Sequence, residues 1–291
     1  MRIVIIGSGG RLGAALMGEY RDEYDVAGFS HAQLDLSNLD GVREKLRSTN
    51  FDVLINAAAF TNVDLCETER DRAFLINAEA PGVLAKIASD KGAQLIHFST
   101  DYVFDGEKRA PYTEEDRANP ISAYGESKLA GENEVLGMGN GHLVVRVSWV
   151  FGPDRPSFID GIIKRAQENE QVDAIADKFS APSYTLDIAA ALPRFFTHDG
   201  YSGGILHFAN AGKCSWREYG QWALDCCREA GIPLKARTVG ACKLRDMKDW
   251  VARRPVYSVL SAAKYAKLTG TSARTWRDAV ADYITRFYSK K

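Results

Sequence analysis

Short apolar runs alternate with longer amphipathic stretches through the first half of the chain. The runs are nearly continuous in apolar residues and rich in valine and isoleucine, which is typical of strands buried on both faces of a parallel sheet. The strands are expected at Arg2–Ile6, Asp25–Phe29, Asp52–Asn56, Gln94–Ser99 and His142–Val147. This alternation predicts an α/β fold in which helices cover a parallel sheet.

The stretches between these strands carry apolar residues at helical spacing. Helices are expected at Leu12–Tyr20, Leu39–Ser48, Glu69–Asn77 with a continuation to Lys91, and Tyr124–Leu136.

The pattern changes beyond Val150, where residues 152–157, GPDRPS, are typical of a loop. An irregular stretch rich in lysine and arginine ends at Pro255. The other elements expected in this part are helices at Phe158–Asn169, Leu186–Phe196, Ser215–Ala230 and Trp276–Phe287, and a late strand at Ile205–Ala209.

The composition favours a globular protein whose partner is a small molecule. The chain has 291 residues, of which 45% are hydrophobic, so it can bury a large core. Its 37 basic and 38 acidic residues give a net charge of -1 without a basic stripe, so we expect neither nucleic acid nor a membrane surface as partner. We expect no membrane helix and no signal peptide, because no apolar run has the required length.

The cysteines have neither CxxC nor Cys/His metal spacing, and their number is odd. Reduced thiols in a cytoplasmic protein are therefore expected, and no metal site is predicted. The five are Cys66, Cys214, Cys226, Cys227 and Cys242.

A glycine-rich segment, GSGGRLG, follows the first strand and precedes the first helix. Gly7, Gly10 and Gly13 have the spacing GxxGxxG. Glycines at such positions permit a tight turn, a close approach of the backbone to a pyrophosphate, and close packing of the helix. The helix N-terminus adds the positive end of its dipole. This context predicts a dinucleotide site, in which we include Arg11 and Leu12.

The end of the second strand bears on the choice of cofactor. An NAD-selective site usually places a carboxylate there to hold the ribose hydroxyl, but here the residues are Phe29, Ser30 and His31. This leaves room for the 2′-phosphate of NADP, with Arg11, Ser30 and His31 as candidate contacts, although Arg11 fits equally well as a solvated loop cation. NADPH is weakly preferred over NADH. Further cofactor contacts are expected at Asp35, Leu36, Asn56, Ala57, Ala58 and Ala59.

These predictions divide the chain into two domains. Residues 1–150 are expected to form a doubly wound, Rossmann-type domain that binds NAD(P) and is rejoined by parts of 183–210. Residues 151–291 are expected to form most of a smaller, discontinuous domain that binds the substrate.

Thr100, Tyr124 and Lys128 are candidate catalytic residues. Thr100 follows the fourth strand, and Tyr124 and Lys128 are four residues apart in YGESK, on one face of a predicted helix. A free tyrosine has a pKa of about 10, and a neighbouring ammonium lowers it, which suits a proton donor. A chain with twelve tyrosines has roughly one tyrosine–lysine pair at this spacing by chance. The pair therefore supports a catalytic role only because of its position after the strand that ends at Thr100 and after the glycine-rich loop.

Longer motifs resemble the extended short-chain dehydrogenase/reductases, and most closely the dTDP-4-dehydrorhamnose reductase family. They span nearly the whole chain and include GSGGRLG, QLDLSN, NAAAFTNVDLCE, NAEAP, IHFSTDYVFDG, PYTEED, NPISAYGESKLAGE, VRVSWVFG and RRPVYSVL. The resemblance implies an NAD(P)H-dependent reductase that transfers hydride to C4 of a 4-keto-6-deoxy nucleotide sugar.

The same resemblance implies roles for individual residues. Tyr124 would be the proton donor, Lys128 would lower its pKa and hold the nicotinamide ribose, and Thr100 would anchor the carbonyl. Asn77 either lies under the cofactor or caps a helix, and Arg254 either binds the substrate diphosphate or is solvated. The sugar pocket would be lined by Thr61, Thr100, Asp101, Tyr102 and Trp149.

One segment departs from the family pattern. Where the family often has DQxGxPT, residues 177–183 read DKFSAPS, with Lys178, Ser180 and Ser183 at the changed positions. This leaves the identity of the sugar open. Two alternatives to a reductase also stay open, namely a non-catalytic NADP-binding regulatory subunit and a nucleotide-sugar epimerase or dehydratase. A monomer or a homodimer is expected.

Overall fold

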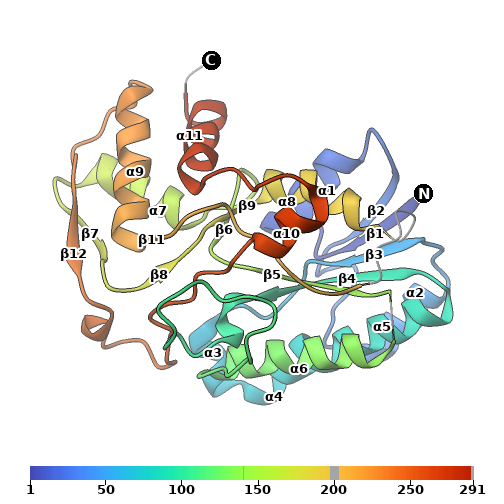
Figure 1. Cartoon of the computed structure of the whole chain (residues 1–291). Coiled ribbons are helices and arrows are strands. Elements are labelled where there is room, and N and C mark those ends of the chain that lie inside the picture. The colour runs from blue at the N-terminus through green and yellow to red at the C-terminus, as the bar shows by residue number, and fades with distance from the viewer. Residues whose placement is uncertain (140, 197–202, 290–291) are drawn as a thin grey trace.

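A parallel sheet of six strands forms the centre of the protein in the order β10-β5-β4-β3-β1-β2 (Figure 1). The computed structural model describes residues 1–139, 141–196 and 203–289, so 197–202 of the segment expected to rejoin the sheet lie outside it. β1 lies between β2 and β3, so the chain runs from β1 to the edge strand β2 and then crosses back over β1 to β3. The strands are β1 (Arg2–Ile6), β2 (Asp25–Phe29), β3 (Val53–Asn56), β4 (Gln94–Thr100), β5 (Leu143–Val147) and β10 (Gly204–His207).

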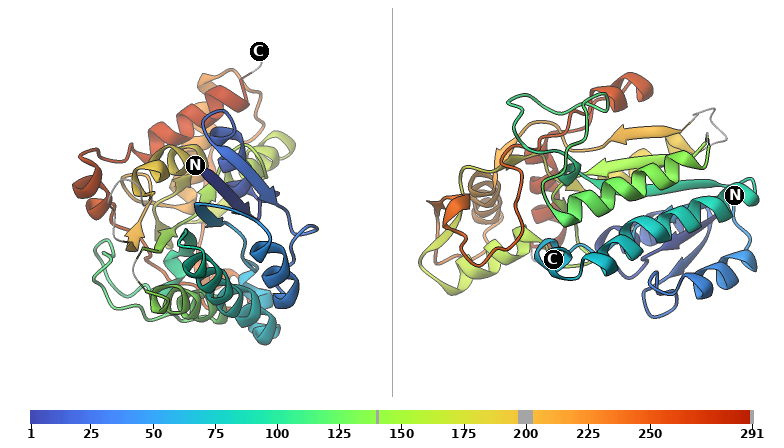
Figure 2. Two further views of the ribbon diagram at one scale, coloured as in Figure 1. Left: turned by 90° about the vertical axis from the view of Figure 1, so that its right-hand side faces the viewer. Right: turned by 90° about the horizontal axis from the view of Figure 1, so that it is seen from below.

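Helices cover both faces of this sheet (Figures 1 and 2). Alternate residues of β1 enter different cores, Ile3 and Ile5 on one face and Val4 and Ile6 on the other, because successive side chains of a strand point to opposite faces. The predicted doubly wound α/β fold is thus confirmed. The helices are α1 (Arg11–Tyr20) and α8 (Thr185–Ala191) on one face, and α2 (Leu39–Arg47), α5 (Ala80–Asp90) and α6 (Ala123–Gly137) on the other.

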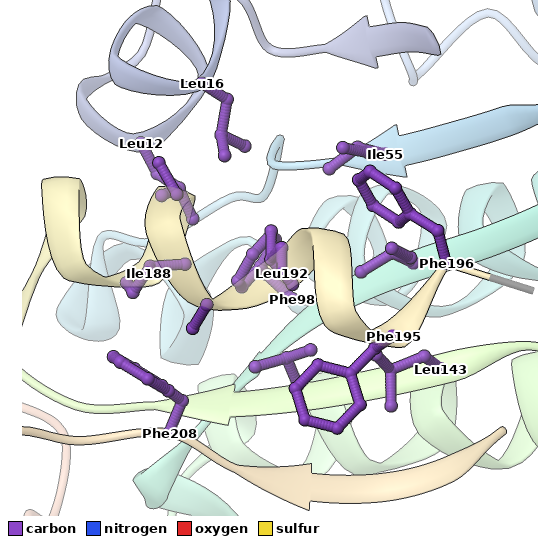
Figure 3. Close-up of a cluster of buried hydrophobic side chains, with 14 of the residues drawn as sticks. Leu12, Leu16, Ile55, Phe98, Leu143, Ile188, Leu192, Phe195, Phe196 and Phe208 are labelled. Carbon is purple, nitrogen blue, oxygen red and sulfur yellow. The ribbon is translucent and has the colours of Figure 1, made fainter. Parts of the chain in front are cut away.

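The core beneath α1 and α8 is shown in Figure 3. Leu12 and Leu16 of α1 and Ile188 of α8 belong to one buried cluster with Phe98 of β4. The helix predicted at Leu186–Phe196 is shorter than expected. It ends at Ala191 and continues as a 3₁₀ helix, η3 (Leu192–Phe195), with Pro193 in its first turn.

The helical run predicted from Glu69 to Lys91 is present but interrupted. A π-helical turn, η1 (Leu75–Glu79), separates α4 (Arg70–Phe74) from α5. Such turns are rare and frequent at functional sites. A short helix that the pattern did not indicate, α3 (Val63–Thr68), precedes the run.

The later part of the chain builds a separate hydrophobic core, to which Phe151, Ile162, Tyr219 and Trp276 contribute. The division into two domains stays a prediction. The elements here are β6 (Val150–Phe151), α7 (Phe158–Glu168), β7 (Val172–Ile175), β8 (Phe179–Ser180), β9 (Ser183–Tyr184), β11 (Cys214–Ser215), α9 (Trp216–Glu229), β12 (Val239–Cys242), η5 (Leu244–Asp246), α10 (Ala263–Thr269) and α11 (Trp276–Phe287).

One expectation for this part was wrong. The stretch expected to be irregular up to Pro255 contains β12, which pairs in parallel with β7. This pairing joins segments more than sixty residues apart, so no local pattern reveals it. Among the described residues, no helix combines the length and apolar character needed to cross a membrane.

Candidate active site

The three candidate catalytic residues come together where β4 ends and α6 begins. Thr100 is the last residue of β4, and its side chain is close enough to Tyr124 to act on the pKa of the phenol. The next residues of the chain form a 3₁₀ turn, η2 (Asp101–Val103). Burial raises the pKa of Tyr124 above its usual range, whereas the neighbouring Thr100 lowers it. The phenol is therefore protonated near neutral pH.

Lys128 is held on β4, one helical turn from Tyr124. Its Nζ donates to the carbonyl oxygen of Phe98 at 2.7 Å and lies 3.2 Å from Nε2 of His97. Burial lowers the pKa of Lys128 to about 8, and the charge of Glu132 opposes this. From its spacing in the sequence, Lys128 was expected to lower the pKa of Tyr124. In the structure burial dominates that pKa, and Thr100 is the group that lowers it.

Two glycines of the YGESKLAGE motif explain how α6 reaches this position. A Cβ atom on Gly125 would lie 2.2 Å from the carbonyl oxygen of Tyr102, and one on Gly131 would lie 2.0 Å from that of Asn77. Both separations are far below a normal contact, so only glycine lets the helix pack this closely. The glycines therefore set the distance between Tyr124 and the end of β4.

A cleft of about 760 Å³ runs from the glycine-rich loop to Tyr124 and Lys128. It lies outside the carboxyl ends of the parallel strands, where open α/β sheets bind ligands. Most residues predicted to bind the cofactor line this cleft, namely Gly7, Gly10, Arg11, Leu12, Ser30, His31, Asp35, Leu36, Ala57, Ala58, Ala59, Tyr124 and Lys128.

Three predicted cofactor residues do not line the cleft and support it from behind. Gly13 packs against the first turn of the loop, because a Cβ there would lie 2.1 Å from the carbonyl oxygen of Gly7. Asn56 accepts from Ala58 N and contacts His97. Asn77 lies in the π-helical turn and forms hydrogen bonds with both backbone groups of Phe60, which lines the cleft, so its place under the cofactor stays a prediction.

Arg11 also differs from its expected role. Its guanidinium donates to the carbonyl oxygens of Val150, Arg155 and Pro156, and so joins the glycine-rich loop to the segment before α7. Each of its three nitrogens thus already has a carbonyl partner, and a contact with a 2′-phosphate stays a prediction. Arg11 lines both the cleft and a second pocket.

This second pocket, of about 320 Å³, opens beside Tyr124 and has an aromatic wall. It shares Thr61, Ser99 and Tyr124 with the cleft. Of the predicted substrate residues, Thr61, Thr100, Asp101, Tyr102 and Trp149 line it. The sequence analysis missed the rest of the wall, chiefly Phe158, Trp216 and Tyr219, because the aromatic pattern of α7 and α9 is also that of ordinary core packing.

Several features of this pocket point to a bound ligand. Trp149 is the only non-glycine residue with positive φ in the described chain, at 42°, a conformation that costs of order 1–3 kcal/mol and is often kept at functional sites. Ser99 Oγ, Trp149 Nε1 and Tyr219 OH are buried without a hydrogen-bond partner. All three residues line the pocket.

Asp101 is held at the back of the pocket by hydroxyl groups. Its carboxylate accepts from Thr100, Ser180 and Ser258. Lys178 is fully buried nearby, donates to the carbonyl oxygen of Pro255 at 2.8 Å, and acts electrostatically on Asp101. The changed segment DKFSAPS therefore supplies a charge and a hydroxyl behind the pocket.

The Lys178 ammonium also faces two of the pocket's aromatic rings. It lies 5.1 Å from the ring centre of Tyr102 and 5.8 Å from that of Trp149. Arg254, by contrast, does not line the pocket. It pairs with Asp64 at 2.6 Å and stacks on Trp250, with 3.8 Å to the ring centre, so its guanidinium is already engaged.

The fold and the site together define an extended short-chain dehydrogenase/reductase. Residues 1–289 match the family described as "RmlD substrate binding domain". The chain is 37% identical over 286 residues to dTDP-4-dehydrorhamnose reductase of Mycolicibacterium smegmatis, covering 97% of this chain and 85% of the relative. The chain therefore belongs to the RmlD substrate binding domain family.

Two further relatives extend the comparison. A probable dTDP-4,6-dihydroxy-2-methyloxan-3-one 4-ketoreductase of Streptomyces antibioticus is 35% identical, covering 97% of this chain and 94% of the relative. The crystal structure of dTDP-4-dehydrorhamnose reductase from Bacillus anthracis in complex with NADP superposes with a TM-score of 0.90 at 30% identity, covering 98% of this chain and 99% of that one.

Proposed function

We propose that the protein is an NAD(P)H-dependent reductase of a 4-keto-6-deoxy nucleotide sugar, acting in the manner of a dTDP-4-dehydrorhamnose reductase. The observation that carries this proposal is the position of Tyr124, on the wall shared by a dinucleotide-sized cleft and an aromatic pocket. Relatives named as reductases of two different dTDP-linked keto sugars support the proposal.

The residues of the cleft fit a nicotinamide dinucleotide. Gly7 has φ of +81°, and a Cβ there would lie 2.9 Å from Ala58 N, so the loop requires glycine at the point where a pyrophosphate approaches. When bound, the reduced nicotinamide supplies a hydride to the carbonyl carbon of the substrate.

The chain's own residues would manage the proton and the developing charge. Thr100 and Tyr124 would hold the carbonyl oxygen by hydrogen bonds, and Tyr124 would give that oxygen its proton. The positive charge of Lys128 would favour the resulting phenolate and hold the nicotinamide ribose. Trp149 would offer a flat apolar surface to the deoxy-sugar ring.

The assembled trio argues against a non-catalytic regulatory subunit. An epimerase or dehydratase would use the same cleft but would return the hydride to its own substrate. We propose a cytoplasmic location, from the reduced cysteines expected in the sequence, and either a monomer or a homodimer.

The direct test is oxidation of NADPH or NADH by the purified protein in the presence of dTDP-4-dehydrorhamnose. We expect oxidation that depends on the sugar nucleotide. Absence of oxidation with this and with UDP-linked 4-keto-6-deoxy sugars would contradict the proposal. Tightly bound NAD with substrate conversion but without net oxidation would favour the epimerase.

A further inference from the structure

Arg155 reaches the cofactor cleft from a distant part of the chain. It belongs to the loop before α7, and its Nε donates to the carbonyl oxygen of Gly9 at 3.0 Å. It lines the cleft together with the glycine-rich loop and Ser30. The residue is exposed, so its side chain can meet a ligand that enters from solvent.

The contact with Gly9 places Arg155 at the adenosine end of the cleft. A Cβ atom on Gly9 would lie 3.6 Å from the Cβ of Ser30, so the two residues are neighbours. Ser30 directly follows β2, where an NAD-selective site holds the 2′-hydroxyl with a carboxylate. The guanidinium of Arg155 therefore lies beside the place of the adenosine 2′ position.

The cleft is lined by three arginines, which differ in how many of their N–H donors already have a hydrogen-bond partner. The three nitrogens of Arg11 donate to backbone carbonyls. Arg72 pairs with Glu69 at 2.8 Å and lies over the ring of Phe60. Within the described parts of the chain, both terminal amino groups of Arg155 lack a hydrogen-bond partner. Of the three, Arg155 is the arginine in which neither terminal amino group has a hydrogen-bond partner among the described residues.

The acid nearest this end of the cleft is already engaged. Oδ1 of Asp35 accepts from the backbone N–H of Ser37 at 2.9 Å and lies 3.7 Å from Nδ1 of His31. The backbone hydrogen bond from Ser37 lowers the pKa of Asp35, so it is ionised and faces His31. A phosphate beside Ser30 would have to be balanced by another cation, and Arg155 is in reach.

We propose that Arg155 binds the 2′-phosphate of NADPH and so selects NADPH over NADH. Two parallel N–H donors of a guanidinium match two phosphate oxygens. This inference rests on the proposed function only in its use of a nicotinamide dinucleotide. It also shows why a local reading of the sequence cannot find the residue, since Arg155 lies more than a hundred residues beyond β2.

The test compares the dissociation constants of NADPH and NADH for the unmodified protein and for Arg155→Gln. The substitution removes the charge but keeps a polar side chain, and we expect NADPH to bind about tenfold more weakly while NADH changes less than about twofold. The affinity for adenosine 2′,5′-bisphosphate should fall as that for NADPH does, and the affinity for AMP should not change. Arg194→Gln is the matched control, because Arg194 is exposed and also bonds a backbone carbonyl, that of Thr269.

The outcomes separate this inference from the proposed function. If Arg155→Gln lowers the affinities for NADPH and NADH equally, Arg155 contacts a group that both dinucleotides share. This result would overturn the 2′-phosphate assignment. Unchanged affinities for both would also overturn it. If the unmodified protein binds neither dinucleotide, the proposed function fails and this inference fails with it.

Discussion

His97 and Lys128 are in direct contact inside the protein, with 3.2 Å between Nε2 of the histidine and Nζ of the lysine. Burial and the charge of Lys128 lower the pKa of His97 well below its ordinary value, so the histidine is neutral. Burial lowers the pKa of Lys128 to about 8. Lys128 is therefore the member of this pair whose charge changes in mildly alkaline solution.

We expect the kcat/KM of the reductase to fall as the pH rises through about 8. Lys128 loses its proton there, and the phenolate of Tyr124 loses a neighbouring positive charge. The measurement is a pH profile of kcat/KM with saturating cofactor. Lys128→Met should be slow at every pH and should lack this alkaline limb. An unmodified profile that stays level to about pH 10 would contradict the assignment.

Replacing Tyr124 by phenylalanine should remove the proton donor while leaving the cleft intact. We expect kcat to fall by about 10² or more, with the dissociation constant of the cofactor changed less than about threefold. Thr100→Val should lower kcat less, because Tyr124 keeps its hydroxyl. Turnover that survives in Tyr124→Phe would remove Tyr124 from the mechanism.

The helix α6 offers a test of how Tyr124 is positioned. Gly125→Ala would place a Cβ 2.2 Å from the carbonyl oxygen of Tyr102, so the helix must shift, and kcat should fall about tenfold or more. Steady-state kinetics measures the change in kcat, and urea denaturation measures the change in the free energy of unfolding. Gly137→Ala is the control, because it lies in the same helix with nothing within 4 Å of the new Cβ, and it should be neutral or slightly stabilising. Equal kinetics for both variants would contradict the packing argument.

Lys178 should matter for the substrate more than for the cofactor. Lys178→Met removes the positive charge behind Tyr102 and Trp149 and near Asp101, so we expect the KM for the sugar nucleotide to rise several-fold, with the affinity for NADPH unchanged. Steady-state kinetics and cofactor titration separate the two. Lys213→Met is the control, because Lys213 is an exposed lysine over the ring of Tyr257.

The same variant makes a prediction for stability. Burial lowers the pKa of Lys178 from 10.5 to about 8, so between these values the unfolded chain binds more protons and this residue adds stability as the pH rises. Lys178→Met lacks that gain. Its free energy of unfolding relative to the unmodified protein should therefore decrease from about pH 8 to about pH 10 in urea denaturation. A difference that is constant with pH would show that Lys178 does not titrate in this range.

Local patterns predicted the sheet well because its strands are buried on both faces. Each of the five early strands is found within two residues of its expected bounds, and the predicted late strand is β10, which joins the same sheet. Elements that depend on distant partners were missed, such as β12, which is formed by pairing with β7. Short helices such as α3 and α10 carry too few periods to be recognised.

In the candidate site, too, the residues with a local sequence signal could be predicted and those placed by tertiary packing could not. The glycine-rich loop and the positions of Thr100, Tyr124 and Lys128 could be predicted, because each follows a strand or shares a helix face. Residues brought in by tertiary packing could not, since Arg155, Tyr219 and His97 have no local signature of function. The guanidinium of Arg254, whose motif suggested a ligand, pairs with Asp64, and a contact with the substrate diphosphate stays a prediction.

The most direct test of the account is the fate of the hydride. The protein is incubated with dTDP-4-dehydrorhamnose and NADPH deuterated at the transferable position of the nicotinamide, and the sugar product is examined by NMR and mass spectrometry. The account predicts a product with deuterium at C4, formed at a rate that Tyr124→Phe greatly reduces. A product without deuterium, or deuterium at another carbon, would contradict it.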